Sequence, residues 1–331
     1  MAPAPGSPPP SGAPWPSALG RLATLPDTPQ KRLAAIGIIL AAMVAAPLVL
    51  GPYATVILTN ALLYAILALG LNIVVGYAGL LDLGYAAFFA VGAYSVGILT
   101  TTFGWNFWAA IPVAVLAAVI AGIIIGGPTL RLRSDYLAIV TLGFGEIVRI
   151  TARNLDITGK ASGIIGIEQP WLFGWHIATS RDFYYVFLVL AVIGALVSLR
   201  LSRSRLGRAW FYVRHDEDAA EAMGIDRVRV KLTAYVIGAI YGAIGGAFFA
   251  VNFTAISPQS FSFQQSTLFL MAVVLGGMGK IPGVILGAFV VVLGPELLRD
   301  LGSFRYLVFA VGLLLIMLFR PSGIWPVAGR R

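Results

Sequence analysis

The sequence predicts an all-α integral membrane protein, a polytopic bundle of about ten transmembrane segments with both termini in the cytoplasm. Of its 331 residues, 59% are hydrophobic and only 11% are charged, whereas soluble domains carry about 25% charged residues. The apolar runs are about 20 residues long, as helical spans require, and lack the alternation of membrane β-strands. The chain has no cysteine, which excludes disulfides, thiolate catalysis and cysteine-bound zinc.

The predicted spans lie between two tails. Residues 1–32 form a disordered cytoplasmic tail that is rich in proline, residues 33–320 the transmembrane domain, and residues 321–331 a cytoplasmic C-terminal tail. The expected segments are, in order, 33–50, 53–75, 76–101, 107–126, 136–151, 183–199, 232–251, 266–277, 284–298 and 307–319. Residues 266–298 form either two short spans or a re-entrant hairpin, and both alternatives return the chain to the outer face.

Several segments are short or interrupted by glycine. Segment 76–101 contains Gly76, Gly79, Gly84, Gly92 and Gly97. Small residues allow helices to pack closely in lipid, and a glycine-broken helix can also line a translocation path, so both interpretations stand. Asp82 lies in the first turns of this segment, and we expect it at the cytoplasmic interface rather than buried.

Two further segments carry informative residues. Segment 136–151 is expected to break at Gly143 and Gly145, and it contains Glu146 one helical turn before Arg149. An intramembrane carboxylate indicates a functional site, but a local ion pair with Arg149 explains Glu146 equally well. Segment 232–251 has small residues on closely spaced turns, which is typical of a tight helix interface. These residues are Gly238, Gly242, Gly245 and Gly246.

A strongly basic loop at 200–231 fixes the predicted orientation. It holds eight of the 23 basic residues, and basic loops between spans remain in the cytoplasm. The loops 154–182 and 252–265 are poor in basic residues by comparison, so we expect them on the outer face. Within the basic loop, acidic residues from Asp216 precede Gly224, which predicts a helix of about two turns.

The ends of this helix have sequence signals of their own. Asp218 and Glu221 have the spacing of a capping box, and Gly224 suits the left-handed position after a helix. Two turns are marginally stable alone in water, so the helix either docks on a partner or rests on lipid headgroups.

The chain lacks the motifs of an enzyme. Gly279 and Lys280 look like the end of a phosphate-binding loop, but Val274 and Ile281 replace the glycine and hydroxyl residue that such a loop needs. We therefore expect no catalytic residues, no cofactor and no metal site. The basic residues lie at span ends, which argues for contact with the bilayer and against nucleic-acid binding. Transport or conduction is the remaining class of function.

Motifs along most of the chain carry a family resemblance. The loop sequence DAAEAMGI resembles the cytoplasmic coupling loop of bacterial ABC-importer permeases. GLLDLGYAAFFAVGAYSVGIL, TLRLRSDYLAIVTLGFGEIVRI, ISPQSFSFQQS, VVLGGMGKIPGVILGAF and LFRPSGIW resemble the permeases of high-affinity branched-chain amino-acid ABC transporters. The resemblance extends from about residue 33 to residue 325, and it departs at Asp82 and at Trp210, Phe211 and Tyr212.

The resemblance implies a multi-pass subunit of an importer in the bacterial inner membrane. A second permease subunit, two ATP-binding subunits and a periplasmic substrate-binding protein would be its partners. The residues expected to couple to the ATP-binding subunits are Asp216, Ala219, Ala220, Glu221 and Gly224. The small Ala219, Ala220 and Ala222 would let the helix sit deep in a groove of that partner. The candidate translocation path comprises Asn72, Gly79, Tyr85, Tyr94 and Glu146.

Three alternatives remain open at the level of sequence. The same machine could import urea or short-chain amides. A different class, an ion-coupled secondary transporter, would need membrane carboxylates such as Glu146, Asp82 and Glu296. A passive channel would conduct without any ATPase.

Overall fold

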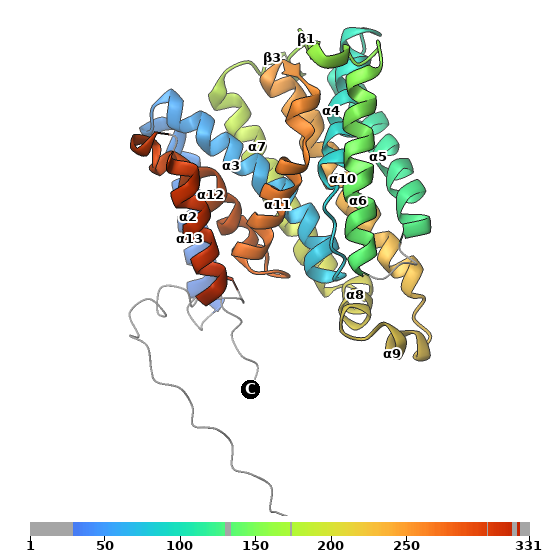
Figure 1. Cartoon of the computed structure of the whole chain (residues 1–331). Coiled ribbons are helices and arrows are strands. Elements are labelled where there is room, and N and C mark those ends of the chain that lie inside the picture. Colours follow the sequence, from blue (N-terminus) through green and yellow to red (C-terminus); the bar gives the residue numbers. More distant parts are fainter. Residues whose placement is uncertain (1–28, 130–133, 173, 303, 320–322, 325–331) are drawn as a thin grey trace, which may run out of the picture.

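The computed structural model describes residues 29–129, 134–172, 174–302, 304–319 and 323–324. The predicted tails at 1–32 and 321–331 therefore fall almost entirely outside the described residues. The described part of the chain is overwhelmingly helical, as predicted (Figure 1). The α-helices are α2 (Pro29–Val49), α3 (Pro52–Leu71), α4 (Ala86–Thr101), α5 (Phe107–Thr129), α6 (Ser134–Asn154), α7 (Ser180–Arg203), α8 (Arg205–His215), α9 (Glu217–Ala222), α10 (Arg227–Phe253), α11 (Phe263–Gly276), α12 (Ile281–Leu297) and α13 (Phe304–Phe319).

Short elements complete the described part of the chain. A π-helix, η1 (Asn72–Tyr77), continues α3, and the 3₁₀ turns are η2 (Lys160–Ser162), η3 (Pro258–Phe261) and η4 (Arg299–Leu301). Strand β1 (Ile164–Ile165) pairs antiparallel with β4 (Ala255–Ile256), and β2 (Trp171–Leu172) with β3 (Trp175–His176). The β1–β4 pair joins the two loops that the sequence assigned to one face, so they do lie at the same end of the molecule.

Among the described residues, four helical segments are long and apolar enough to cross a membrane: 52–77, 107–129, 180–203 and 227–253. Shorter apolar helices surround them. Helices α11 and α12 have 14 and 17 residues, which corresponds to about 21 and 25 Å at about 1.5 Å per residue. Each is shorter than the hydrocarbon core of a bilayer, about 30 Å.

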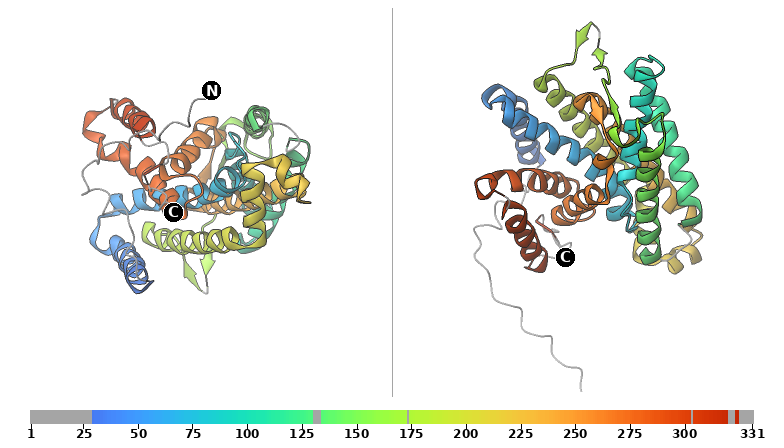
Figure 2. Two further views of the ribbon diagram at one scale, coloured as in Figure 1. Left: turned by 90° about the horizontal axis from the view of Figure 1, so that it is seen from below. Right: turned by 45° about the horizontal axis from the view of Figure 1, so that its top comes forward.

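The helices pack as two sets around α10 and α3. Helix α10 packs against α4 and α5, whereas α3 packs against α7 and α12, and α11 packs against α12. Figures 1 and 2 show α4, α5 and α6 on one side of the molecule and α2, α12 and α13 on the other. The core between them is apolar and rich in aromatic side chains.

The glycine seam predicted in segment 232–251 is present. A Cβ at Gly246 would lie 2.1 Å from the backbone oxygen of Phe89, and one at Gly92 would lie 2.2 Å from that of Ala243. Helices α4 and α10 thus touch backbone to backbone, which only glycine permits at these positions.

The segment expected at 76–101 is not one continuous helix. The π-turn ends at Tyr77, and α4 begins only at Ala86. The intervening stretch passes against α6 so closely that a Cβ at Gly84 would lie 1.9 Å from the oxygen of Thr141. The expected position of Asp82 is also wrong, because its side chain is fully buried. Its Oδ1 accepts a hydrogen bond from the Gly84 amide at 2.8 Å, which caps the turn leading into α4.

The break expected at Gly143 and Gly145 is also wrong. Helix α6 is continuous from Ser134 to Asn154. Gly145 instead allows the stretch between η1 and α4 to pack closely on α6, since a Cβ at Gly145 would lie 3.3 Å from the Cα of Gly84.

Candidate functional site

The basic loop folds into two helices at one end of the molecule (Figure 1). The Ser204 hydroxyl caps α8 by accepting from the Gly207 amide at 3.2 Å, and this helix was not foreseen from the sequence. Asp216 then caps α9, accepting from the amides of Asp218 and Ala219 at 3.1 and 3.0 Å.

The predicted short helix therefore exists, although its capping differs from the expectation. Asp216 alone caps the start, and the capping box between Asp218 and Glu221 does not form. Gly224 has φ +83°, the left-handed conformation expected after the helix.

The acidic side chains of α9 are paired with the first turns of α10. Glu217 contacts Lys231 at 2.6 Å, and Glu221 contacts Arg227 at 3.2 Å. The side chain of Lys231 is only 4% exposed, whereas that of Glu217 is 43% exposed. Asp218 adds a longer contact with Arg227 at 3.6 Å. These pairs fix α9 to α10, so the two helices are expected to move together.

The small residues of α9 face two ways. Ala219 and Ala222 are exposed, and the neighbouring Met223 is 83% exposed. Ala220 is only 5% exposed because it packs into its own chain. The expectation that all three alanines share one docking face is therefore wrong for Ala220, because a six-residue helix that packs on the chain must turn one side inward.

Helix α8 contacts the π-turn that ends the first long span. The Trp210 indole is fully buried, and its Nε1 donates to the oxygen of Val230 at 2.9 Å. Its ring stacks on that of Tyr77, with centroids 6.4 Å apart. The guanidinium of Arg214 donates to the oxygen of Gly76. The aromatic run in which the sequence departs from the family pattern thus supplies a core contact through Trp210.

Three of the expected path residues hold segments together. The Asn72 Oδ1 accepts from the Gly279 amide at 2.8 Å, which links η1 to the α11–α12 turn. Gly79, at φ +73°, lies beneath the Arg214 side chain. The Tyr85 hydroxyl donates to the oxygen of Gly238 at 2.9 Å.

The other two expected path residues also have protein neighbours. Tyr94 is buried against Phe261, with ring centroids 5.5 Å apart. Glu146 forms an ion pair with Arg149 at 2.7 Å. The structure thus contains the local ion pair that the sequence offered as one of two explanations for Glu146.

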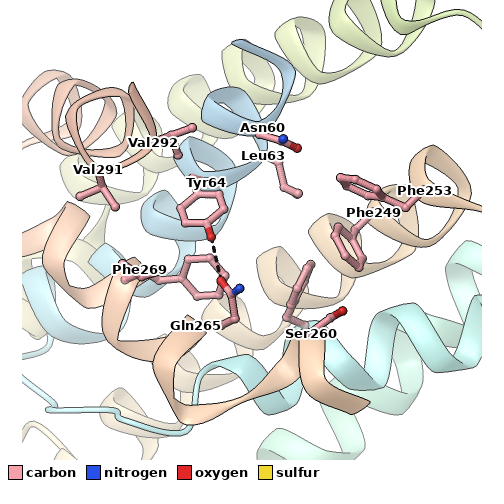
Figure 3. Close-up of a pocket in the computed structure, with 12 residues that line it drawn as sticks. Asn60, Leu63, Tyr64, Phe249, Phe253, Ser260, Gln265, Phe269, Val291 and Val292 are labelled. Carbon is pink, nitrogen blue, oxygen red and sulfur yellow. Dashed lines mark hydrogen bonds between the residues drawn. The ribbon is translucent and has the colours of Figure 1, made fainter. Parts of the chain in front are cut away.

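A cavity of about 340 Å³ lies where α3, α10, α11 and α12 meet (Figure 3). Aromatic and aliphatic side chains form most of its wall. Among the described residues that line it there is no charged side chain, and the polar groups are those of Asn60, Tyr64, Ser260 and Gln265. The Tyr64 hydroxyl donates to the Gln265 Oε1 at 2.7 Å across the floor of the cavity.

None of the five expected path residues lines this cavity. Two sequence signals pointed toward it: Asn60 is a polar residue inside an apolar span, and Gln265 ends an uncharged polar segment. Such a cavity suits a small solute with an apolar part, because aromatic walls take up apolar surface while neutral amides and hydroxyls bind its polar groups.

Helix α10 joins the two regions. Its first turns carry Arg227 and Lys231, which pair with α9, and its last turns carry Phe249 and Phe253, which line the cavity. The helix has 27 residues and spans about 40 Å at about 1.5 Å per residue. A displacement of α9 would therefore reach the cavity wall through one continuous helix.

These features define a helical, multi-pass membrane protein with a solute-sized, partly open cavity between its helices. Residues 53–319 match the family model described as the permease component of branched-chain amino acid transport systems, and the chain belongs to this family. The resemblance predicted from the motifs is thereby confirmed.

Relatives in bacteria and archaea agree with this assignment. The permease protein LivM of the Escherichia coli (strain K12) high-affinity branched-chain amino acid transport system is 43% identical over 82% of this chain and 69% of its own length. A probable LivM permease of Methanocaldococcus jannaschii is 30% identical over 80% of this chain and 90% of its own. The Escherichia coli (strain K12) permease protein LivH is 25% identical over 79% of this chain and 90% of its own. No solved structure matches the chain.

Proposed function

We propose that this chain is one of two permease subunits of an ATP-driven importer for branched-chain amino acids in the bacterial inner membrane. The observation that carries the proposal is the continuity of α10 between the cavity and α9. Two ATP-binding subunits dock on α9, a second permease subunit of the LivH type completes the path, and a periplasmic binding protein delivers the substrate. The chain crosses the membrane in ten segments, with both termini and the basic loop in the cytoplasm.

The docking face on α9 consists of Ala219, Ala222 and Met223. These side chains are exposed, whereas the acidic side chains beside them are held by α10. A small apolar surface surrounded by internally paired charges suits insertion into a groove of a partner, since few charges must lose their water on docking. ATP-driven movement of the partner would then displace α9 together with α10.

The cavity is the proposed place where this chain contacts the substrate. Phe249, Phe253 and Phe269 suit a branched aliphatic side chain, and the Tyr64–Gln265 pair suits the polar end of an amino acid. Uptake of radiolabelled leucine, compared with urea and acetamide in the same cells, distinguishes the proposed substrate from the alternative cargoes.

The docking test uses Met223→Asp and Ala219→Trp in cells that also produce the other subunits. We expect either change to lower copurification of the ATP-binding subunits at least fivefold, because it places charge or bulk in the proposed groove. Ile165→Asp is the matched control, since Ile165 is 75% exposed at the opposite end of the molecule. If both α9 variants retain the ATP-binding subunits as well as the parent and the control do, the proposal is wrong.

A further inference from the structure

A second cavity, of about 460 Å³, lies beside α8 and away from the proposed path. Its wall combines the end of α7, helix α8, the π-turn η1 and the α11–α12 turn. It contains three cationic side chains, those of Arg208, Arg214 and Lys280, and the described residues that line it include no carboxylate.

The surroundings of these cations differ from those on the other side of the same loop. Arg227, Arg229 and Lys231 each pair with a carboxylate. Arg208 and Arg214 donate instead to the backbone oxygens of Arg203 and Gly76, which bear no net charge. Four acidic residues of the loop are thus paired with the start of α10, whereas the described lining of the cavity has cationic side chains and no carboxylate.

The third cation reinforces this field. Lys280 immediately precedes α12, so the positive end of that helix dipole also faces the cavity. Partial burial lowers the pKa of the Lys280 side chain, because the protein removes part of its water.

The rim of the cavity indicates which anion fits. Phe211 and Tyr212 are each 56% exposed, and Met278 is exposed beside them. Helix α8 supplies much of the wall, and the rest comes from the ends of α7 and η1 and from the α11–α12 turn. Lipid headgroups lie at the ends of membrane spans, and aromatic side chains are enriched at that depth. A soluble anion would need only the cations, whereas a lipid would also use this apolar rim.

We propose that this cavity binds the phosphate of an anionic phospholipid headgroup from the adjacent leaflet. The phosphate lies among Arg208, Arg214 and Lys280, and the glycerol and upper acyl chains lie against Phe211, Tyr212 and Met278. Bound in this way, the lipid joins α8 to the α11–α12 turn. The inference requires only that the chain is embedded in a membrane, so it stands or falls independently of ATP coupling.

The test measures thermal unfolding of the purified full chain in neutral detergent by tryptophan fluorescence. We expect phosphatidylglycerol to raise the midpoint in a saturable manner, and zwitterionic phosphatidylcholine to leave it unchanged. Arg208→Gln and Lys280→Gln should each weaken the apparent affinity for phosphatidylglycerol about fivefold, the usual effect of one cation near an anionic membrane surface. Arg214 is left intact because it also holds η1.

Arg200→Gln and Arg205→Gln are the matched controls, since both residues belong to the same loop and neither lines the cavity. They should change the affinity less than twofold. Equal losses in the controls would mean diffuse charge attraction and would overturn the site. Equal stabilisation by phosphatidylcholine, or equal saturable stabilisation by inorganic phosphate, would overturn the assignment to an anionic lipid. The lipid comparison on the parent chain decides the question even if a variant fails to fold.

Discussion

The ion pair between Glu217 and Lys231 is the part of the proposed docking region whose energetic role is easiest to measure. Glu217→Gln keeps the shape of the side chain but leaves the Lys231 ammonium, only 4% exposed, without its counter-charge. Breaking a fully buried pair costs about 3–5 kcal/mol, and an exposed pair contributes about 0–1 kcal/mol. Because Glu217 is 43% exposed and water can replace part of its effect, we expect a loss of about 1–3 kcal/mol.

The assay is reversible unfolding of the purified chain by sodium dodecyl sulfate in mixed micelles. The double variant Glu217→Gln with Lys231→Met should regain most of the lost stability, because it removes the buried charge as well as its partner. Asp156→Asn is the matched control: Asp156 pairs with Lys160 at 2.5 Å, but its side chain is 89% exposed. If Glu217→Gln costs no more than this control, the pair does not fix α9 to α10.

Two further predictions concern the cavity and the glycine seam. Gln265→Leu should lower leucine uptake about three- to tenfold, since it removes the acceptor of the Tyr64 hydroxyl. The neighbouring Gln264 is exposed and outside the cavity, so Gln264→Leu should leave uptake unchanged. Equal uptake by both variants would contradict the proposed path. Gly246→Ala should lower the free energy of unfolding by about 1–3 kcal/mol, because its Cβ would lie 2.1 Å from a backbone oxygen of α4. Gly127→Ala should be close to neutral, because a Cβ there meets nothing within 4 Å. Similar stabilities of the two alanine variants would show that the helices separate at little cost.

The sequence predicted those features that depend on local chemistry. The apolar runs located the helices, and the acidic start and Gly224 located α9. The glycines of segment 232–251 predicted a tight interface, because repeated small residues allow another helix to pack closely against them. The sequence did not show that the neighbour is α4, because that follows only from the tertiary arrangement.

The errors share a physical cause. The interruption before α4 lies where α6 comes close to Gly84, with the Leu83 amide donating to the Thr141 hydroxyl, and the buried Asp82 belongs to the same stretch. Both involve α6, a segment that begins about 50 residues later in the chain, so no local pattern reports them. Among the expected path residues, the Asn72 Oδ1 and the Tyr85 hydroxyl bond to backbone groups of other segments. Only the packing of separate helices shows which polar side chains are left facing a cavity.

The arrangement of the helix sets suggests how the cavity would respond to a displacement of α9. Figure 3 shows Phe249 of α10 on one side of the cavity and Tyr64 of α3 and Gln265 of α11 on the other, and the ring of Phe89 of α4 packs on that of Phe249 with centroids 4.9 Å apart. The α4–α10 side is bound by backbone contact at the glycine seam, and α10 is bound to α9 by ion pairs. A displacement of α9 therefore acts first on the wall formed by α4 and α10, while α3 in the opposite wall packs against α7 and α12 as well as against α10. Because packed interfaces shift between discrete arrangements rather than stretching, a small displacement of α9 would widen or close the space between the two walls.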